Sequence, residues 1–366
     1  MKLGIISVVI GSFIMVFIPF NLFSGSLQSE GVDYWSMEGV LIEHEFNDSL
    51  DLLSDQVIFE LQDKNGLPAW FGRYIFKDVC ILGQCRMVSI WLFWDGAGNY
   101  LGIQLLDDEP LTKSDHTEFE PEDYSKLESI LKNPNSILKD TKSEDLTLKP
   151  ESDNPFEVDG YSGATQPALA DVVVNDAVYS CHTLWHTVYG PTMDKIMDIL
   201  EERVDEDYLK MMFESGKPDF VIWGIRSIKQ FPLYHDSFYH FIVEEIKSDY
   251  DRLYEEAIGY FGPDKMEDHT VQMELVSLIP GLATQKKYDI IWKFIETDLV
   301  YEEVVEALLE FFQDSYIGVG ALNLIYRVVN KEHIENNQNI NRIIRDLAEH
   351  ENAYVRNLTL RLINSN

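Results

Sequence analysis

The pattern of apolar residues changes at Pro191, and this change constrains the fold more than any other feature. Beyond it, strand-like alternation stops and apolar residues recur every three or four positions to the end of the chain. That spacing is typical of amphipathic helices. Residues 33–190 instead mix strand-like and helix-like runs, and 366 residues are too many for a single typical core. We therefore expect an α+β protein, with a mixed domain at 33–190 and an all-helical domain at 191–366.

The mixed domain carries one clear hairpin signal and one clear helix signal. In "RMVSIWLFWDGAGNYLGIQLL" two β-rich runs flank the turn residues 95–99. Further on, Leu127, Ile130 and Leu131 recur at helical spacing until Asn133-Pro134 ends the pattern. Strands followed by a helix are expected here.

The helical domain contains four segments that look alike. They are "VIWGIRSI" from 221, "QMELVSLI" from 272, "GVGALNLI" from 318 and "VRNLTLRL" from 355. Their first residues are 51, 46 and 37 positions apart, an irregular period that is close to that of helical-hairpin repeats. The last lies in "ENAYVRNLTLRLI", which resembles the second helix of a HEAT-type repeat, with Val355-Arg356 before an apolar stripe at Leu358, Leu360 and Leu362. The sequence favours a short HEAT-like array. An irregular helical bundle remains the alternative.

The N-terminus carries an export or anchor signal. Residues 3–23, "LGIISVVIGSFIMVFIPFNLF", contain no charge, and as a helix they would reach about 30 Å, enough to cross a bilayer. Lys2 precedes this run and the next basic residue is Lys64, which predicts a cytoplasmic N-terminus and an extracytoplasmic body. We expect residues 1–26 to be a signal or anchor segment that holds the protein on the periplasmic side of the inner membrane. Cleavage near Ser26 would instead release a secreted protein.

The charge of the chain excludes one class of partner. Its formal net charge is −34, from 63 acidic and 29 basic side chains. Such a surface repels phosphate backbones, so nucleic acid is not an expected partner.

Two of the cysteines are close in sequence. Cys80 and Cys85 bracket "ILGQ", and a loop of that length between paired strands could bring them within disulfide range in an oxidising compartment. A disulfide and two free thiols both remain open. A zinc site would need two more ligands nearby, and the sequence shows none.

The stretch "DGYSGAT" provides the most specific signal. Its pattern of Asp159, Ser162, Gly163, Ala164 and Thr165 resembles the flavinylation motif of the FMN-binding domain family, which includes the flavin subunits of the Rnf and sodium-pumping NADH:quinone reductase complexes. The resemblance implies that Thr165 carries FMN through a phosphoester bond, installed outside the cytoplasm by a flavin transferase that uses FAD. A chance match to all five positions is expected in about one chain per thousand.

The residue types in this motif suit such a modification. Gly163 can adopt a positive φ and lets the backbone approach a phosphate, and Ala164 adds no bulk beside the hydroxyl. A helix starting near Pro167 would place N–H groups toward the phosphate. The structural alternative is that Thr165 only caps that helix.

A second cluster follows in "AVYSCHTLWHTVYGP". Cys181 and Trp185 are four residues apart, as are His182 and His186, so each pair shares a helix face. Two histidines without a further ligand make an incomplete metal site, so no metal is predicted. We expect an aromatic helix that closes the flavin domain. Contact of Trp185 or His186 with the flavin ring remains open.

Other catalytic signatures are missing from the sequence. It has no dinucleotide-binding glycine fingerprint, P-loop, nucleophile elbow or zinc-binding His-Glu-x-x-His helix. Without a placed acid or base, an electron carrier is favoured over a stand-alone oxidoreductase, with redox partner proteins docking on residues 191–366. The second hypothesis is a helical-repeat interaction scaffold whose threonine loop is purely structural.

Overall fold

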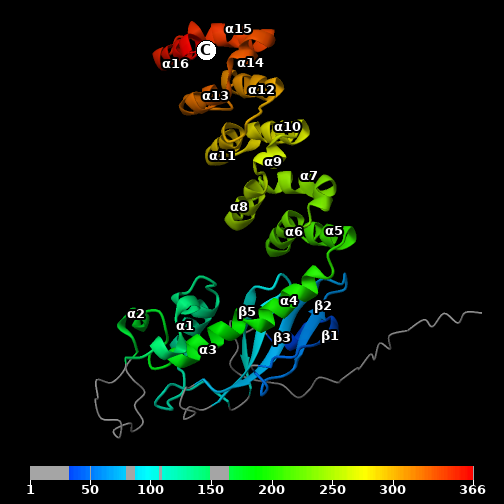
Figure 1. Ribbon diagram of the computed structural model, residues 1–366, viewed down its shortest axis with the longest axis vertical. Coiled ribbons are helices and arrows are strands. Elements are labelled where there is room, and N and C mark those ends of the chain that lie inside the picture. The colour runs from blue at the N-terminus through cyan, green and yellow to red at the C-terminus, as the bar shows by residue number, and fades with distance from the viewer. Residues whose placement is uncertain (1–32, 50, 80–86, 107–108, 149–164, 366) are drawn as a thin grey trace, which may run out of the picture. The chain divides into compact units, whose positions relative to one another are not determined.

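The computed structural model describes residues 33–49, 51–79, 87–106, 109–148 and 165–365, which form two compact units, Met1–Ile199 and Leu200–Asn366 (Figure 1). The described part of the first unit combines a sheet with helices, and that of the second is helical, so the α+β class is confirmed. The units divide after Ile199, later than the boundary at residue 190 that the sequence suggested. Helix α4 (Pro191–Glu201) explains the difference, because Thr192 accepts a hydrogen bond from Arg73 within the first unit.

A five-stranded antiparallel sheet forms the centre of the first unit, with neighbouring strands following chain order. Its strands are β1 (Val40–Glu45), β2 (Val57–Gln62), β3 (Pro68–Lys77), β4 (Val88–Asp95) and β5 (Tyr100–Leu105). The hairpin predicted around residues 95–99 is confirmed as the β4–β5 turn. There Asp95 accepts hydrogen bonds from the N–H groups of Ala97 and Asn99, and Gly98 has a φ of 81° that favours glycine.

One face of this sheet is covered by helices. Helix α1 (Pro121–Leu131) contains the predicted helical residues and ends before Asn133, and the hydroxyl of Tyr100 on β5 donates to its Glu128. Helix α3 (Val178–Val188) is tied to β4, because the indole of Trp94 donates to the carbonyl of Val188 over 3.0 Å. The core of the unit therefore lies between the sheet and α1, α3 and α4.

The opposite face carries aromatic side chains. The short 3₁₀ helix η2 (Tyr34–Ser36) packs on it, and the Trp70 indole donates to the carbonyl of Tyr34 over 2.9 Å. Trp35 contacts Trp70 and Trp91 edge-to-face, with ring centroids 5.1 and 4.7 Å apart. Such edge contacts stabilise aromatic clusters beyond simple burial.

The segment between α1 and α3 is short of regular structure. Its described elements are the 3₁₀ turns η3 (Ile137–Asp140) and η4 (Ser143–Asp145) and the one-turn helix α2 (Pro167–Ala170). The first two of these lie along α3 and form part of the site below.

Helices of the second unit pack as successive hairpins. The contacting pairs are α5 (Glu206–Glu214) with α6 (Pro218–Gln230), α7 (His235–Glu245) with α8 (Asp251–Tyr260), α10 (His269–Leu278) with α11 (Thr284–Ile295), α12 (Glu302–Gln313) with α13 (Leu322–Val328), and α15 (Gln338–Ala348) with α16 (Ala353–Ser365). The short helices α9 (Pro263–Met266) and α14 (Lys331–Asn336) precede the third and fifth pairs. Figure 1 shows these pairs following one another within the unit.

The repeat in this unit has a shorter period than the sequence comparison suggested. The first helices of the last four pairs begin at residues 235, 269, 302 and 338, which are intervals of 34, 33 and 36 residues. Three of the four similar segments lie on second helices, but the one from residue 272 lies on α10, a first helix. The intervals of 51 and 46 residues therefore compared helices from different positions in the hairpin.

The apolar stripe expected on the last helix also differs. Val355, Thr359 and Leu362 face inward, whereas Leu360 is 42% exposed. The expected stripe had a spacing of two, which does not stay on one face of a helix, and the inward residues have spacings of four and three. The Tyr326 hydroxyl on α13 and Thr359 share a buried 2.6 Å hydrogen bond, so a threonine occupies the inner position.

The predicted membrane segment at residues 3–23 lies outside the described residues. Among the helices that the structure does describe, none combines the length and apolar character needed to cross a bilayer.

Candidate functional site

Helix α3 is held firmly in the first unit and presents the second sequence cluster. The indole of Trp185 donates to the carbonyl of Asn133 over 2.9 Å, and the hydroxyl of Tyr189 donates to the carbonyl of Leu131 over 2.6 Å. Both acceptors lie at or just beyond the end of α1. Trp185 is only 3% exposed, so it is a packing residue between the two helices.

His182 and His186 lie on one face of α3, as their spacing predicted. The Nε2 of His182 is 2.8 Å from the carbonyl oxygen of Thr141, and the Nε2 of His186 is 3.0 Å from that of Leu138. Because a carbonyl oxygen can only accept, each Nε2 carries a proton, and each neutral ring keeps Nδ1 as an acceptor. The two histidines therefore fasten the segment 138–141 to α3.

The two imidazoles affect each other. Their ring centroids are 4.3 Å apart. Burial lowers the pKa of His182, its hydrogen bond to the Thr141 carbonyl raises that pKa, and the neighbouring His186 lowers it. The net direction is downward, so His182 stays neutral to a lower pH than a free histidine.

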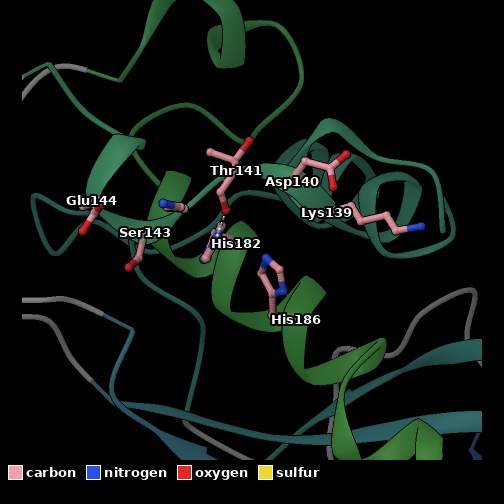
Figure 2. Close-up of a pocket in the computed structure, with 8 residues that line it drawn as sticks. Lys139, Asp140, Thr141, Ser143, Glu144, His182 and His186 are labelled. Atoms are coloured by element: carbon pink, nitrogen blue, oxygen red, sulfur yellow. Dashed lines mark hydrogen bonds between the residues drawn. The ribbon is translucent and has the colours of Figure 1, made fainter.

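A shallow pocket of about 460 Å³ lies where these histidines meet the segment after α1. Figure 2 shows both rings projecting from α3 toward that segment. The lining combines imidazoles, hydroxyls and charges of both signs, from Lys139, Asp140, Thr141, Lys142, Ser143, Glu144, His182 and His186. Its chemistry suits a polar ligand that is partly exposed to solvent.

Thr165 does not line this pocket, but it is linked to the pocket segment and to α3 through Thr147. It pairs with Thr147 in an antiparallel bridge, and the chain reaches Thr147 three residues after Glu144, which lines the pocket. Thr147 Oγ1 is also 3.2 Å from the hydroxyl of Tyr179, one turn before His182 on α3. The half-buried Thr165 is therefore positioned at the Tyr179 end of the same helix face.

The capping alternative for Thr165 does not match the geometry. Helix α2 begins at Pro167 and its N-cap is Gln166, not Thr165. Within the described residues Gln166 makes no side-chain capping bond, although its backbone N–H donates to the carbonyl of Leu146. The helix spans only four residues, so its dipole would contribute little to binding a phosphate.

Other predicted site residues lie outside the described part of the chain. These are Asp159, Ser162, Gly163 and Ala164 of the motif and the cysteines Cys80 and Cys85. Cys181 is described and fully buried, where it accepts a hydrogen bond from the N–H of Val174. Burial raises the pKa of its thiol to about 12, so it is not a reactive nucleophile.

Metal binding has no support in the described ranges. Within them, His, Cys, Asp and Glu side chains do not gather in groups of three or more that could hold an ion.

The sequence missed three features of this site, namely Thr147, Tyr179 and the pocket segment 139–144. Nothing in the composition of residues 139–144 indicates that this segment would lie against α3. A scan of protein-family models and searches of curated proteins and solved structures found no match to this chain.

Proposed function

We propose that the protein is an extracytoplasmic electron carrier with FMN attached covalently to Thr165. The proposal is carried by one observation: Thr165, which ends the flavinylation-like motif, is half-buried, is not the N-cap of α2, and forms a backbone bridge with Thr147, three residues after the pocket-lining Glu144. The predicted segment at 3–23 would hold the chain at the membrane surface where the flavin transferase works.

The attachment balances chemically. Thr165 Oγ1 forms a bond to the phosphorus of the FMN half of FAD, the anhydride bond of FAD breaks, and AMP leaves. The hydroxyl proton passes to a base supplied with the transferase. A permanent link suits a compartment without a flavin pool, because the local concentration no longer depends on a Kd.

In this proposal the flavin would contact residues that line the pocket. Lys139 and Lys142 supply positive charge, which favours the negative charge of a reduced flavin, and the imidazoles of His182 and His186 supply hydrogen-bonding groups. Flavin can take up two electrons and release them singly. Trp185 is buried and outside the pocket lining, so His186 is the flavin-proximal residue that the geometry favours.

The second unit is proposed to be a HEAT-like array that docks a redox partner protein. Its helices pair in chain order, and the first helices of the five pairs begin at intervals of 29 to 36 residues, shorter than the roughly 40–47 residues of HEAT repeats. Stacked hairpins commonly provide extended protein-binding surfaces. Figure 1 shows α5 to α16 arranged in these pairs.

The test uses two threonines that face each other across one bridge. The chain is co-expressed with a flavin transferase and exported, and flavin fluorescence is read on a denaturing gel. Thr165→Ala should be dark. Thr147→Ala, which removes the partner hydroxyl but not the motif, should keep a fluorescent band.

Two results would contradict the proposal. A fluorescent band in Thr165→Ala would place flavin elsewhere, and a dark wild-type chain in a competent host would remove the redox role. If the wild-type chain is dark, the hairpin array would favour the interaction scaffold as the function. Charge reversals on residues 191–366 should then abolish capture of the partner protein, and Thr165→Ala should leave this capture intact.

A further inference from the structure

The loop that joins β1 to β2 exposes two adjacent leucines. Leu52 is 75% exposed and Leu53 is 65% exposed, whereas most large apolar side chains of this unit are buried. Phe76, whose backbone N–H donates to Ser54 of the loop, is a further 37% exposed. Contiguous exposed apolar groups on a folded domain commonly mark an interaction site.

The loop is fixed by its own hydrogen bonds. The side chain of Gln56 accepts from the N–H of Asp48 and donates to the carbonyls of Asp51 and Ser54, over 2.8 to 3.0 Å. The N–H of Asp55 also donates to the carbonyl of Tyr74 on β3 over 3.1 Å. These hydrogen bonds hold Asp48, Asp51, Ser54 and Asp55, the described residues on either side of the two leucines.

Two acidic groups of this loop are paired with cations beneath it. Asp48 contacts the buried guanidinium of Arg73 at 3.2 Å, and Asp51 lies 3.4 Å from the Nζ of Lys77. Both carboxylates are less than one-tenth exposed. The end of the loop consequently presents apolar surface, although the chain as a whole carries a net charge of −34.

We propose that Leu52 and Leu53 insert into the surface of the lipid bilayer that the segment 3–23 is predicted to span. The ten residues from Ser24 to Asp33 reach at most about 36 Å, and the six residues of β1 extend about 20 Å, so the loop lies within reach of the membrane.

This contact would fix the orientation of the first unit on its tether. The membrane-contact proposal rests on the predicted anchor segment and not on the flavin, so the membrane proposal and the flavin proposal can fail separately. A lipid occupant is favoured over a protein because the tether already holds the loop near a bilayer, and the insertion of apolar side chains requires no matching partner surface.

The test places a nitroxide at Leu53→Cys in the full chain, with Cys80→Ser and Cys85→Ser. Cys181 is fully buried and stays unlabelled. The chain is reconstituted through its own apolar segment into phosphatidylcholine nanodiscs, and electron paramagnetic resonance compares accessibility to oxygen with accessibility to a water-soluble nickel complex. The control is Ser125→Cys, an exposed site on α1 at the other face of the sheet.

We expect a several-fold higher oxygen-to-nickel ratio at position 53 than at position 125. In a second variant the nitroxide is placed at Asn47→Cys. Adding Leu52→Ser and Leu53→Ser to this variant should lower its oxygen-to-nickel ratio to that at position 125. Because both leucines are exposed, the fold should tolerate these two changes. Equal ratios at 53 and 125 overturn the proposal, as does failure of the chain to enter the bilayer. Flavin fluorescence of the same samples on a denaturing gel shows separately whether the flavin proposal holds.

Discussion

At the residue scale, His182 links the site to the stability of its domain. Burial is the main cause that lowers its pKa, with the neighbouring His186 adding in the same direction. In the unfolded chain a histidine has a pKa of about 6.5. Between the lower native value and 6.5 the unfolded chain binds more protons, so the free energy of unfolding falls as the pH falls through this window. Above pH 6.5 the contribution is fully present.

We predict that His182→Gln makes unfolding of the first unit less sensitive to pH. Glutamine keeps an N–H donor for the Thr141 carbonyl but cannot be protonated. Thermal unfolding between pH 5 and 8, followed by tryptophan fluorescence, should show a smaller loss of stability toward acid than wild type. Five of the seven tryptophans lie in the first unit, and exposed His269→Gln is the control. Parallel curves for His182→Gln and wild type would contradict the assignment.

Sequence reasoning placed both histidines on one helix face because the three- and four-residue spacing of a helix is local. The same reasoning could not identify the backbone carbonyl groups that the two histidines contact. The carbonyl of Thr141 is 41 residues from His182, and only tertiary packing brings it there. Backbone acceptors carry no residue-type signal, which is why the sequence does not reveal that residues 138–141 lie against α3.

At the element scale, α4 decides where the first unit ends. Pro191 is a strong start signal for a helix, and α4 begins at this residue. A helix start does not determine which core the helix joins. That depends on contacts such as Arg73 with Thr192, and on Gly98, where an added Cβ would lie 2.8 Å from the sulfur of Met197.

We predict that Thr192→Val destabilises the first unit by about 1–3 kcal/mol, because buried Arg73 loses one acceptor while the volume stays nearly constant. Chemical denaturation followed by tryptophan fluorescence measures the change. Thr297→Val, which removes a hydroxyl bonded only to its own helix, serves as the comparison. An unchanged midpoint for Thr192→Val would argue that α4 does not stabilise this unit.

At the scale of the whole molecule, Thr165 and the pocket on α3 belong to the first unit, and the helical hairpins belong to the second. The sequence identified the helical character of the second unit, but it aligned α10 with second helices such as α6. Both helix positions share the same apolar spacing, so a short segment does not reveal its place in a hairpin. The repeat becomes clear only from which helices contact each other.

This separation predicts that damage to the array leaves flavin attachment intact. Leu308 on α12 is fully buried, and Leu308→Ala should cost about 2–5 kcal/mol through the cavity it creates. Circular dichroism should report a lower midpoint for the helical unit. Flavin fluorescence per chain on a denaturing gel should equal that of wild type, and its loss would show that the array is needed for loading.

The most direct test of the account is peptide mass spectrometry of the exported protein from a host with a flavin transferase. The account predicts that the peptide containing Thr165 is heavier by one FMN less one water, with fragments that place the addition on this threonine. An unmodified peptide, or the addition on another residue, would contradict it.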